Sequence, residues 1–369
     1  MTDSQSLIDD IRGFQVPMTC TDLVETMKLF TDQLGFRIDA IFPADSPKTA
    51  ILSAHNLTLR LSVGTPDRGV RELQLLCVDP GRHLDGKREL VAPNGVVVRL
   101  VHADPPMRLP ATRQELVLAS ATDNVLWSIG RAGLRYRDLL PNRHGGAFIA
   151  SHIRILEGGP VPDYVHYHKV RFQAIFCRKG WVRVVYEGQG EPIVMKSGDC
   201  VLQPPEIRHR VLESSAGAEV IEISSPAEHI TIVDHQMTLP TEIYPRDHDF
   251  GGQRFVRHVA GEAQWRPWNS DGFVMTDTGI GAATNGLLAG IRVVRPAQAK
   301  PATVRCHATE FCFFFVLSGS LTLEHEGRSH ALRADDSLTL PGGLAYGFAA
   351  CSADLELLEV TLPATFELA

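Results

Sequence analysis

One offset recurs over the C-terminal two thirds of this 369-residue chain. Matching residues stand 137 to 139 positions apart; they include Gly133 with Gly272, Asp138 with Asp277, His168 with His307, Gly180 with Gly319, Arg154 with Arg292 (138 apart), Asp199 with Asp336, Pro204 with Pro341, Glu219 with Glu356, Glu222 with Glu359 and Pro226 with Pro363. A sustained offset predicts a duplicated structural unit, and its drift from 139 to 137 indicates that the second copy lost two residues.

Each copy is rich in short apolar runs. In the first copy the runs cover 148–156, 172–176, 181–186, 200–203 and 219–223, and they contain Val, Ile and aromatic residues between Gly and Pro turns. This pattern is typical of strands. We therefore predict that each copy is a small antiparallel barrel.

A different pattern precedes the repeat. Asp22 and Glu25 have the spacing of a capping box, apolar residues follow at 23, 27, 30 and 34, and Gly35 can end the helix. Strand-like runs cover 14–20, 36–42, 50–53, 57–63, 73–78 and 96–101. The predicted order is βαβββ followed by further strands.

These patterns divide the chain. We expect a tail at 1–13, a first domain at 14–104, a linker at 105–130, one barrel at 131–240 and a second at 241–369. The proline-rich stretch 104–110 marks the first boundary. A helix or loop is expected at 112–126, and the stretch from 225 to about 250 should join the barrels.

Composition restricts the class of protein. Hydrophobic residues make up 44% of the chain, enough for sizeable cores, and the longest apolar run, Phe311 to Leu317, is too short to span a membrane. The first residues lack the features of a secretory signal, and seven cysteines without a CxxC pair fit reduced thiols, so a cytoplasmic protein is expected. A net charge of −7 disfavours nucleic acid and anionic membranes as partners. No GxGxxG follows a strand, so no dinucleotide cofactor is predicted.

Three histidines in the first copy have the spacing of metal ligands. His166 and His168 are two residues apart, so on a strand both side chains leave the same face. About forty residues later, Gly198-Asp199, Pro204 and His209 supply a turn, a second turn and a third imidazole. Neutral imidazole suits iron, copper, nickel, manganese or zinc.

This arrangement resembles the two motifs of the cupin superfamily, whose fold is an RmlC-like jelly roll, and the tandem copy resembles a bicupin over residues 131–369. The resemblance implies a mainly β fold with two double-stranded β-helix barrels. It also implies that His166, His168 and His209 point into the first barrel and hold one divalent metal. Where cupins often have a fourth ligand, a Glu, this chain has Gln173, expected to be a weak ligand or a hydrogen-bond donor to a metal-bound water. The alternative is an emptied cupin whose histidines only pack.

The second copy lacks most of these ligands. Arg305, His307, Cys312 and Tyr346 stand at the places of His166, His168, Gln173 and His209. An arginine there would repel a cation, so no metal is expected. We expect a structural barrel that covers the first barrel or forms a dimer interface; the alternative is a pocket in which Arg305 holds a carboxylate.

Other polar residues near the motif are weaker candidates for orienting an anionic substrate: Tyr164, Tyr167, Arg154, Arg171, Glu206 and Arg208. Tyr167 should face away from the ligands, and His152 shares a strand face with Arg154. Because Arg154 is matched by Arg292, we expect Arg154 to form a structural ion pair, with Asp138 as its partner.

The N-terminal βαβββ pattern resembles the vicinal-oxygen-chelate fold of glyoxalases and extradiol dioxygenases over residues 14–102. Where that family often has a metal His and a Glu, this chain has Gln15 and Arg99. We expect a degenerate scaffold or a partner-contacting domain; a small-ligand pocket is the alternative.

The resemblance to cupins favours a non-haem Fe(II) dioxygenase acting on a small carboxylated or oxygenated substrate, with Gln173 assisting at the metal. A Zn, Mn or Ni Lewis acid serving an isomerase, lyase or hydrolase is a second hypothesis. A non-catalytic small-molecule-binding cupin is a third. A homodimer is expected because closed symmetric dimers are the commonest assemblies.

Overall fold

The computed structural model describes residues 9–33, 35–54, 56–65, 72–82, 86–91, 97–122, 126–288, 292–297 and 304–367. The chain divides into two compact units. One contains residues 1–108 with 229–236, and the other contains residues 109–228 with 237–369.

The first unit is built on one mixed sheet. Its strands lie in the order β20 (Thr231–Val233), β2 (Arg37–Phe42), β3 (Thr49–Ala54), β4 (Leu57–Val63), β1 (Ile11–Cys20), β5 (Glu72–Cys77), β7 (Val97–His102) and β6 (Glu89–Val91). The β1/β4 and β5/β7 pairs are parallel, and the other pairs are antiparallel. The predicted βαβββ order is therefore present, although the predicted strand residue Val96 lies outside the described residues.

The predicted helix is shorter than the apolar pattern suggested. Helix α2 (Leu23–Lys28) begins at Asp22, whose side chain accepts a hydrogen bond from the Glu25 backbone N–H at 3.0 Å. The α-helix ends at Lys28, and a π-helical turn follows it over Leu29–Gln33. Leu34 lies outside the described residues. Its apolar side packs against the buried strand residues Ala50, Leu52 and Leu61.

Of the two residues compared with chelate-fold ligands, Arg99 belongs to an ion-pair cluster and Gln15 lies two strands away. The register places Gln15 beside Gln74 and Gln74 beside Arg99. Arg99 pairs with Glu72 at 3.2 Å and with Glu89 at 3.4 Å. A guanidinium held by two carboxylates offers no electron pair to a metal.

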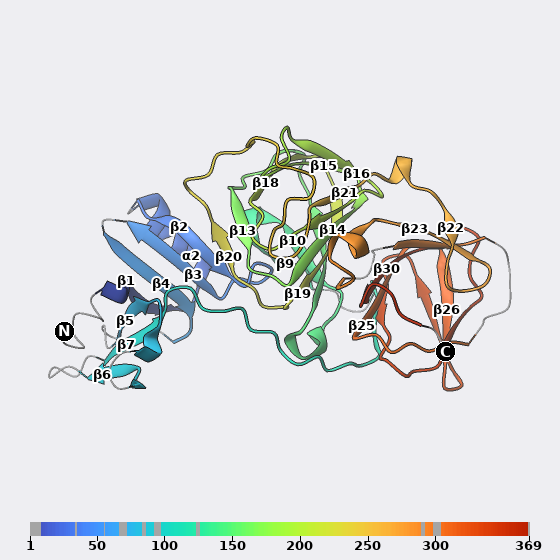
Figure 1. The fold of residues 1–369 in the computed structure, drawn as a ribbon, viewed down its shortest axis with the longest axis horizontal. Helices are drawn as coiled ribbons and strands as arrows, with labels where there is room; N and C mark the ends of the chain where they lie inside the picture. Colours follow the sequence, from blue (N-terminus) through green and yellow to red (C-terminus); the bar gives the residue numbers. More distant parts are fainter. Residues whose placement is uncertain are drawn as a thin grey trace. The chain divides into compact units, whose positions relative to one another are not determined.

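The second unit holds two barrels, drawn from green to yellow and from orange to red in Figure 1. One sheet of the first barrel runs β21 (Val256–His258), β17 (Cys200–Gln203), β14 (Phe172–Lys179), β19 (Ala218–Ser225), β11 (Ile149–Ile155), β10 (Arg135–Asp138) and β9 (Ser128–Ile129). Its other strands are β16 (Ile193–Lys196), β15 (Trp181–Tyr186) and β18 (His209–Ser214), with β13 (His166–His168) and β12 (Gly159–Pro160) both pairing with β18.

The second barrel repeats this plan. Its larger sheet runs β22 (Arg266–Pro267), β23 (Phe273–Asp277), β24 (Arg292–Pro296), β30 (Glu356–Leu362), β25 (Phe311–Ser318), β28 (Ser337–Thr339) and β8 (Val117–Ala119). The smaller sheet contains β27 (Arg328–Arg333), β26 (Ser320–His325) and β29 (Tyr346–Ala349). Among the described residues, the remaining helical turns are short: Pro80–Arg82, Arg131–Gly133, Arg143–Gly146, Ala260–Glu262 and the α-helical turn Ile280–Ala283.

The strand registers show the duplication. His166 pairs with His209 in the first barrel, and Arg305 forms the corresponding bridge with Tyr346 in the second. One predicted match is wrong. Ser151 pairs with Glu222, whereas Arg292 pairs with Glu359, so Arg292 is equivalent to Ser151.

The equivalent of Arg154 is therefore Arg295, three residues further along β24. The expected ion pair with Asp138 is also wrong. Arg154 contacts Glu219 at 3.2 Å, and Asp138 pairs with Arg143 at 3.0 Å.

The repeats exchange their first strands. Strand β8 precedes the first barrel in sequence but pairs with β28 of the second, whereas β21 precedes the second barrel and pairs with β17 of the first. The expected helix or loop at 112–126 thus contains a strand, because β28 offers it a free edge. The exchange extends the repeat to about residue 117.

The larger sheets of the two barrels share one apolar core. It joins residues of β14, β19 and β11 with residues of β25 and β30. At its centre the rings of Phe148 and Phe311 stack with centroids 4.2 Å apart. Strands buried on both faces explain the continuous apolar runs in the sequence.

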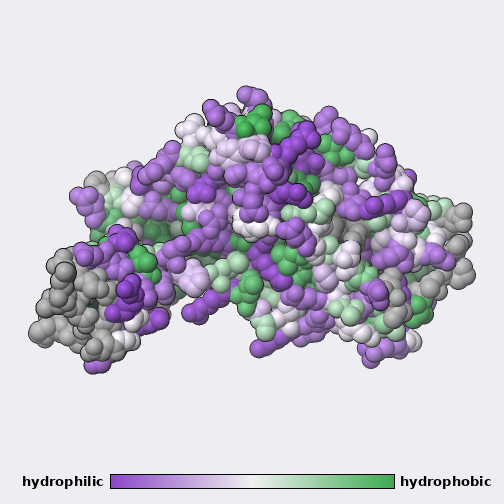
Figure 2. Space-filling model, viewed as in Figure 1, coloured by the Kyte–Doolittle hydropathy of each residue, from purple (hydrophilic) through white to green (hydrophobic). Residues whose placement is uncertain are grey.

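The surface is mixed in character. In the view of Figure 2 hydrophilic residues predominate, with apolar residues in small scattered groups. Among the described residues, no helix is long and apolar enough to cross a membrane.

We predict that Phe311→Ala lowers the free energy of unfolding by about 3–5 kcal/mol, because it leaves a cavity in the shared core. Phe14→Ala is the matched control, since Phe14 is 58% exposed and its loss should change stability by less than about 0.5 kcal/mol. Urea denaturation of both variants tests this; equal losses would show that the shared core is not what holds the barrels together.

Candidate metal centre

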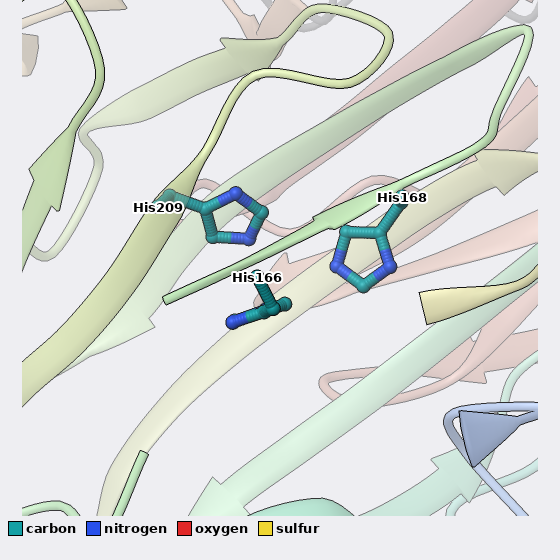
Figure 3. A group of neighbouring side chains, drawn as sticks. All are labelled: His166, His168 and His209. Atoms are coloured by element: carbon teal, nitrogen blue, oxygen red, sulfur yellow. The ribbon is translucent and has the colours of Figure 1, made fainter. Parts of the chain in front are cut away.

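Three imidazoles meet inside the first barrel. His166 and His168 leave the same face of β13, and His209 begins the neighbouring strand β18. Their potential ligand atoms all lie within 4.8 Å of one another, and all three residues are buried. Figure 3 shows the three rings gathered around one space. The structure thus brings together the three residues predicted as ligands.

Backbone carbonyls orient two of these rings. His166 Nδ1 lies 2.8 Å from the Tyr164 carbonyl oxygen, and His209 Nδ1 lies 2.9 Å from that of Ile207. A carbonyl only accepts, so each Nδ1 carries the proton and each Nε2 keeps a free electron pair. This outer hydrogen bond is the usual partner of a metal-ligating histidine.

The surroundings keep two of the rings, those of His166 and His209, neutral. Burial lowers the pKa of His209 to about 4. Burial, and next the positive charge of Arg131, lowers the pKa of His166 well below its ordinary value. Metal binding at neutral pH therefore requires no loss of a proton from these two rings.

The residues fit a divalent metal. His166 Nε2 is a buried nitrogen with no hydrogen-bond partner, which is a costly arrangement unless another group binds there. Three neutral nitrogens on one side leave other coordination positions open, as in catalytic rather than closed structural sites.

Gln173 lies inside the same barrel, where its amide contacts an acidic residue. Its Nε2 donates to Glu222 Oε1 at 2.6 Å, and Ser224 Oγ donates to the same oxygen at 3.2 Å. The side chain is buried. The amide is therefore held by a carboxylate that the sequence reasoning did not assign to the site.

Two further polar residues connect Gln173 to the histidines. Gln173 is opposite Gln203 across β14 and β17, and Gln203 Nε2 donates to the Tyr186 hydroxyl at 3.1 Å. Tyr186 is opposite His209, with ring centroids 5.7 Å apart. Strand alternation could have found Glu222, since it shares a face with Ser224, but only once the register of β19 was known.

Most of the weaker candidates lie elsewhere. Arg208 stacks on Tyr167 at 4.2 Å, Arg171 pairs with Glu310, and Glu206 occupies a turn with φ 61°. His152 bonds Glu219 at 2.8 Å. Of this set, Tyr164 stays near the metal centre, with its ring 5.9 Å from that of His166.

The second barrel places a cation where the first has its histidines. The Arg305 guanidinium lies 4.2 Å from the ring centroid of Trp268 and 5.1 Å from that of Tyr346. His307 Nδ1 accepts from the Thr309 backbone N–H at 3.3 Å. An aromatic cage around an arginine favours the structural role expected for this barrel and disfavours a second metal.

We predict one divalent metal per chain. His209→Ala should remove most of it because an incomplete set of three ligands binds weakly, whereas His307→Ala should leave it unchanged. Elemental analysis of the untagged protein measures both, and two metals per chain, or loss of metal in His307→Ala, would contradict the assignment.

Comparisons with known proteins agree on the second barrel. A family described as "Cupin domain" matches residues 291–361, within the barrel that lacks the three histidines. No curated protein matches this chain.

Several solved structures are similar in fold at low sequence identity. The protein Ylba from E. coli is 11% identical, with 70% of this chain and 95% of that one covered and a TM-score of 0.49. A variant of oxalate decarboxylase from Bacillus subtilis is 15% identical, with 72% and 80% covered and a TM-score of 0.49. A variant of salicylate 1,2-dioxygenase from Pseudoaminobacter salicylatoxidans is 12% identical, with 69% and 85% covered and a TM-score of 0.49. The sequence match itself identifies a cupin domain at residues 291–361 of this mainly β chain.

Proposed function

We propose that the first barrel is a mononuclear metal centre in which His166, His168 and His209 hold Fe(II), and that the protein is a non-haem dioxygenase. The observation that carries the proposal is the set of three buried imidazoles, two of them locked with Nδ1 on a backbone carbonyl. Zinc, manganese or nickel would suit the same nitrogens for Lewis-acid chemistry, so the identity of the metal separates the two hypotheses.

The chain's own residues have distinct tasks in this proposal. Three neutral ligands do not themselves neutralise a divalent ion, which favours an anionic substrate such as a small carboxylate or enolate as a further ligand. Fe(II), when bound, would mediate electron transfer from that substrate to dioxygen, so the substrate itself is the reductant. The buried walls around the histidines limit access of water.

In this proposal Gln173 and Glu222 form the polar wall, the polar part of the barrel interior beside the three histidines. Because Glu222 accepts the amide proton of Gln173, the Gln173 side chain is fixed. Glu222 also adds a negative charge inside the barrel, although its carboxylate belongs to no described cluster of metal ligands. Gln173 is therefore a positioning residue in this proposal rather than a strong ligand.

We predict substrate-dependent oxygen uptake by the iron-loaded protein, measured with an oxygen electrode over thiols, gentisate-like aromatics and β-diketones. Gln173→Ala should keep its iron but lose about 10- to 100-fold in activity, as expected for an outer partner of a metal site. His209→Ala should lose both iron and activity.

The outcomes separate the competing functions. Turnover with zinc or manganese but no oxygen uptake would favour the isomerase, lyase or hydrolase hypothesis. Saturable ligand binding without turnover for any metal would favour a non-catalytic cupin. Full activity in Gln173→Ala would remove Gln173 from the mechanism.

A further inference from the structure

A cavity of about 340 Å³ lies where the two barrels meet. Its walls include Arg178 of β14, Thr276 of β23, Leu317 of β25 and Glu356 of β30, with Trp265 just before β22. This volume is in the range of small-molecule sites, about 300–1,000 Å³. Trp265 is 37% exposed, so the cavity reaches the surface.

Because the barrels are repeats, their interface contains two equivalent regions. The region around Glu219 is the first corner, and the region around Glu356, which contains the cavity, is the second corner. The strand registers make the following residues equivalent: Trp127 and Trp265, Arg137 and Thr276, Arg178 and Leu317, Glu219 and Glu356, and Asp335 and Gly198. Strand β14 has a bulge just before Lys179, which pairs with Glu219. Strand β25 has the same bulge just before Ser318, which pairs with Glu356.

Guanidinium groups fill the first corner. Glu219 contacts Arg178 at 3.0 Å, Arg154 at 3.2 Å and His152 at 2.8 Å. Arg178 also pairs with Asp335 at 2.5 Å, and Arg137 donates to the Asp335 carbonyl oxygen at 2.6 Å. Two acidic side chains are thus neutralised by arginines supplied by the chain itself.

The second corner has kept the acid and one of the three arginines. Leu317 and Thr276 replace two arginines by short uncharged side chains, and Gly198 takes the place of Asp335. Within the described parts of the chain, Glu356 has no hydrogen bond or ion pair. Arg295, the equivalent of Arg154, lies 3.7 Å from the Trp265 ring centroid without pairing with Glu356. The cavity therefore occupies the space that the side chains of Arg178 and Arg137 fill in the first corner.

Two other titratable groups that line the cavity do not oppose a cation, and the Arg295 guanidinium nearby lies over the Trp265 ring. Arg178 also lines it, but its charge is compensated by Glu219 and Asp335. Burial lowers the pKa of His258, another wall residue, so its imidazole is neutral at neutral pH.

We propose that this cavity binds a small organic cation, a guanidinium or primary ammonium compound, whose charged group pairs with Glu356 as Arg178 pairs with Glu219. Charge-assisted hydrogen bonds to a carboxylate supply the affinity. The site is separate from the metal centre and does not depend on the proposed oxygen chemistry.

Isothermal titration calorimetry of the full chain with methylguanidinium or propylammonium chloride, at constant ionic strength, tests the proposal. We expect saturable binding of one cation per chain, tighter for the guanidinium if it is held by two hydrogen bonds. Glu356→Gln should weaken binding at least tenfold, and because Glu356 has no described partner this variant should fold normally. Glu324→Gln, which removes an exposed acid of the same barrel, is the matched control and should bind like the wild type.

A second variant puts an arginine back into the second corner. Leu317→Arg places a guanidinium at the position equivalent to Arg178, so it should abolish cation binding and raise the melting temperature by a few degrees. No saturable binding by the wild type, or equal affinity in Glu356→Gln, would overturn the proposal. Unchanged binding in His209→Ala would show that the cation does not act through the metal centre, and lost binding there would also overturn it.

Discussion

The apolar contact between the two barrels is the constraint on which most of the second unit depends. Strands β14 and β19 bury one face against the second barrel through residues such as Phe172 and Ile221, and the opposite face lines their own barrel. Strict alternation along a strand then directs Gln173, Glu222 and Ser224 inward. A slip of one residue would place these polar groups in the aromatic core, so the interface also fixes the polar wall beside the histidines.

The cluster of three histidines depends on the opposite sheet. There β13 is three residues long and pairs with β18 at His166 and His209. So short a strand could not hold two imidazoles by pairing alone. The carbonyl groups of Tyr164 and Ile207 orient the rings, each from a residue two positions before the histidine that it holds. The same local geometry therefore appears twice around one site.

The sequence was informative where the signal is local and less so where pairing partners are distant. The spacing of His166, His168 and His209 and the Asp22 cap are local signals; the structure contains the cap and brings the three histidines together. Strands β8 and β21 are only three residues long, and their partners are determined by edges more than fifty residues away. Glu222 and the Arg154–Glu219 pair were missed for a related reason, because a side chain's direction follows from a register that spacing alone does not reveal.

The reciprocal exchange of β8 and β21 gives the duplicated chain the topology of a strand-exchanged dimer. Each repeat lends its leading strand to the other, so neither barrel has a complete sheet made only from its own repeat. Two identical copies of a single repeat would complete one another in the same way, as a domain-swapped symmetric dimer does. The present chain has the connectivity of such a dimer with its subunits joined end to end. Within one chain the two copies need not be identical, and here one barrel holds three histidines while the other holds a caged arginine.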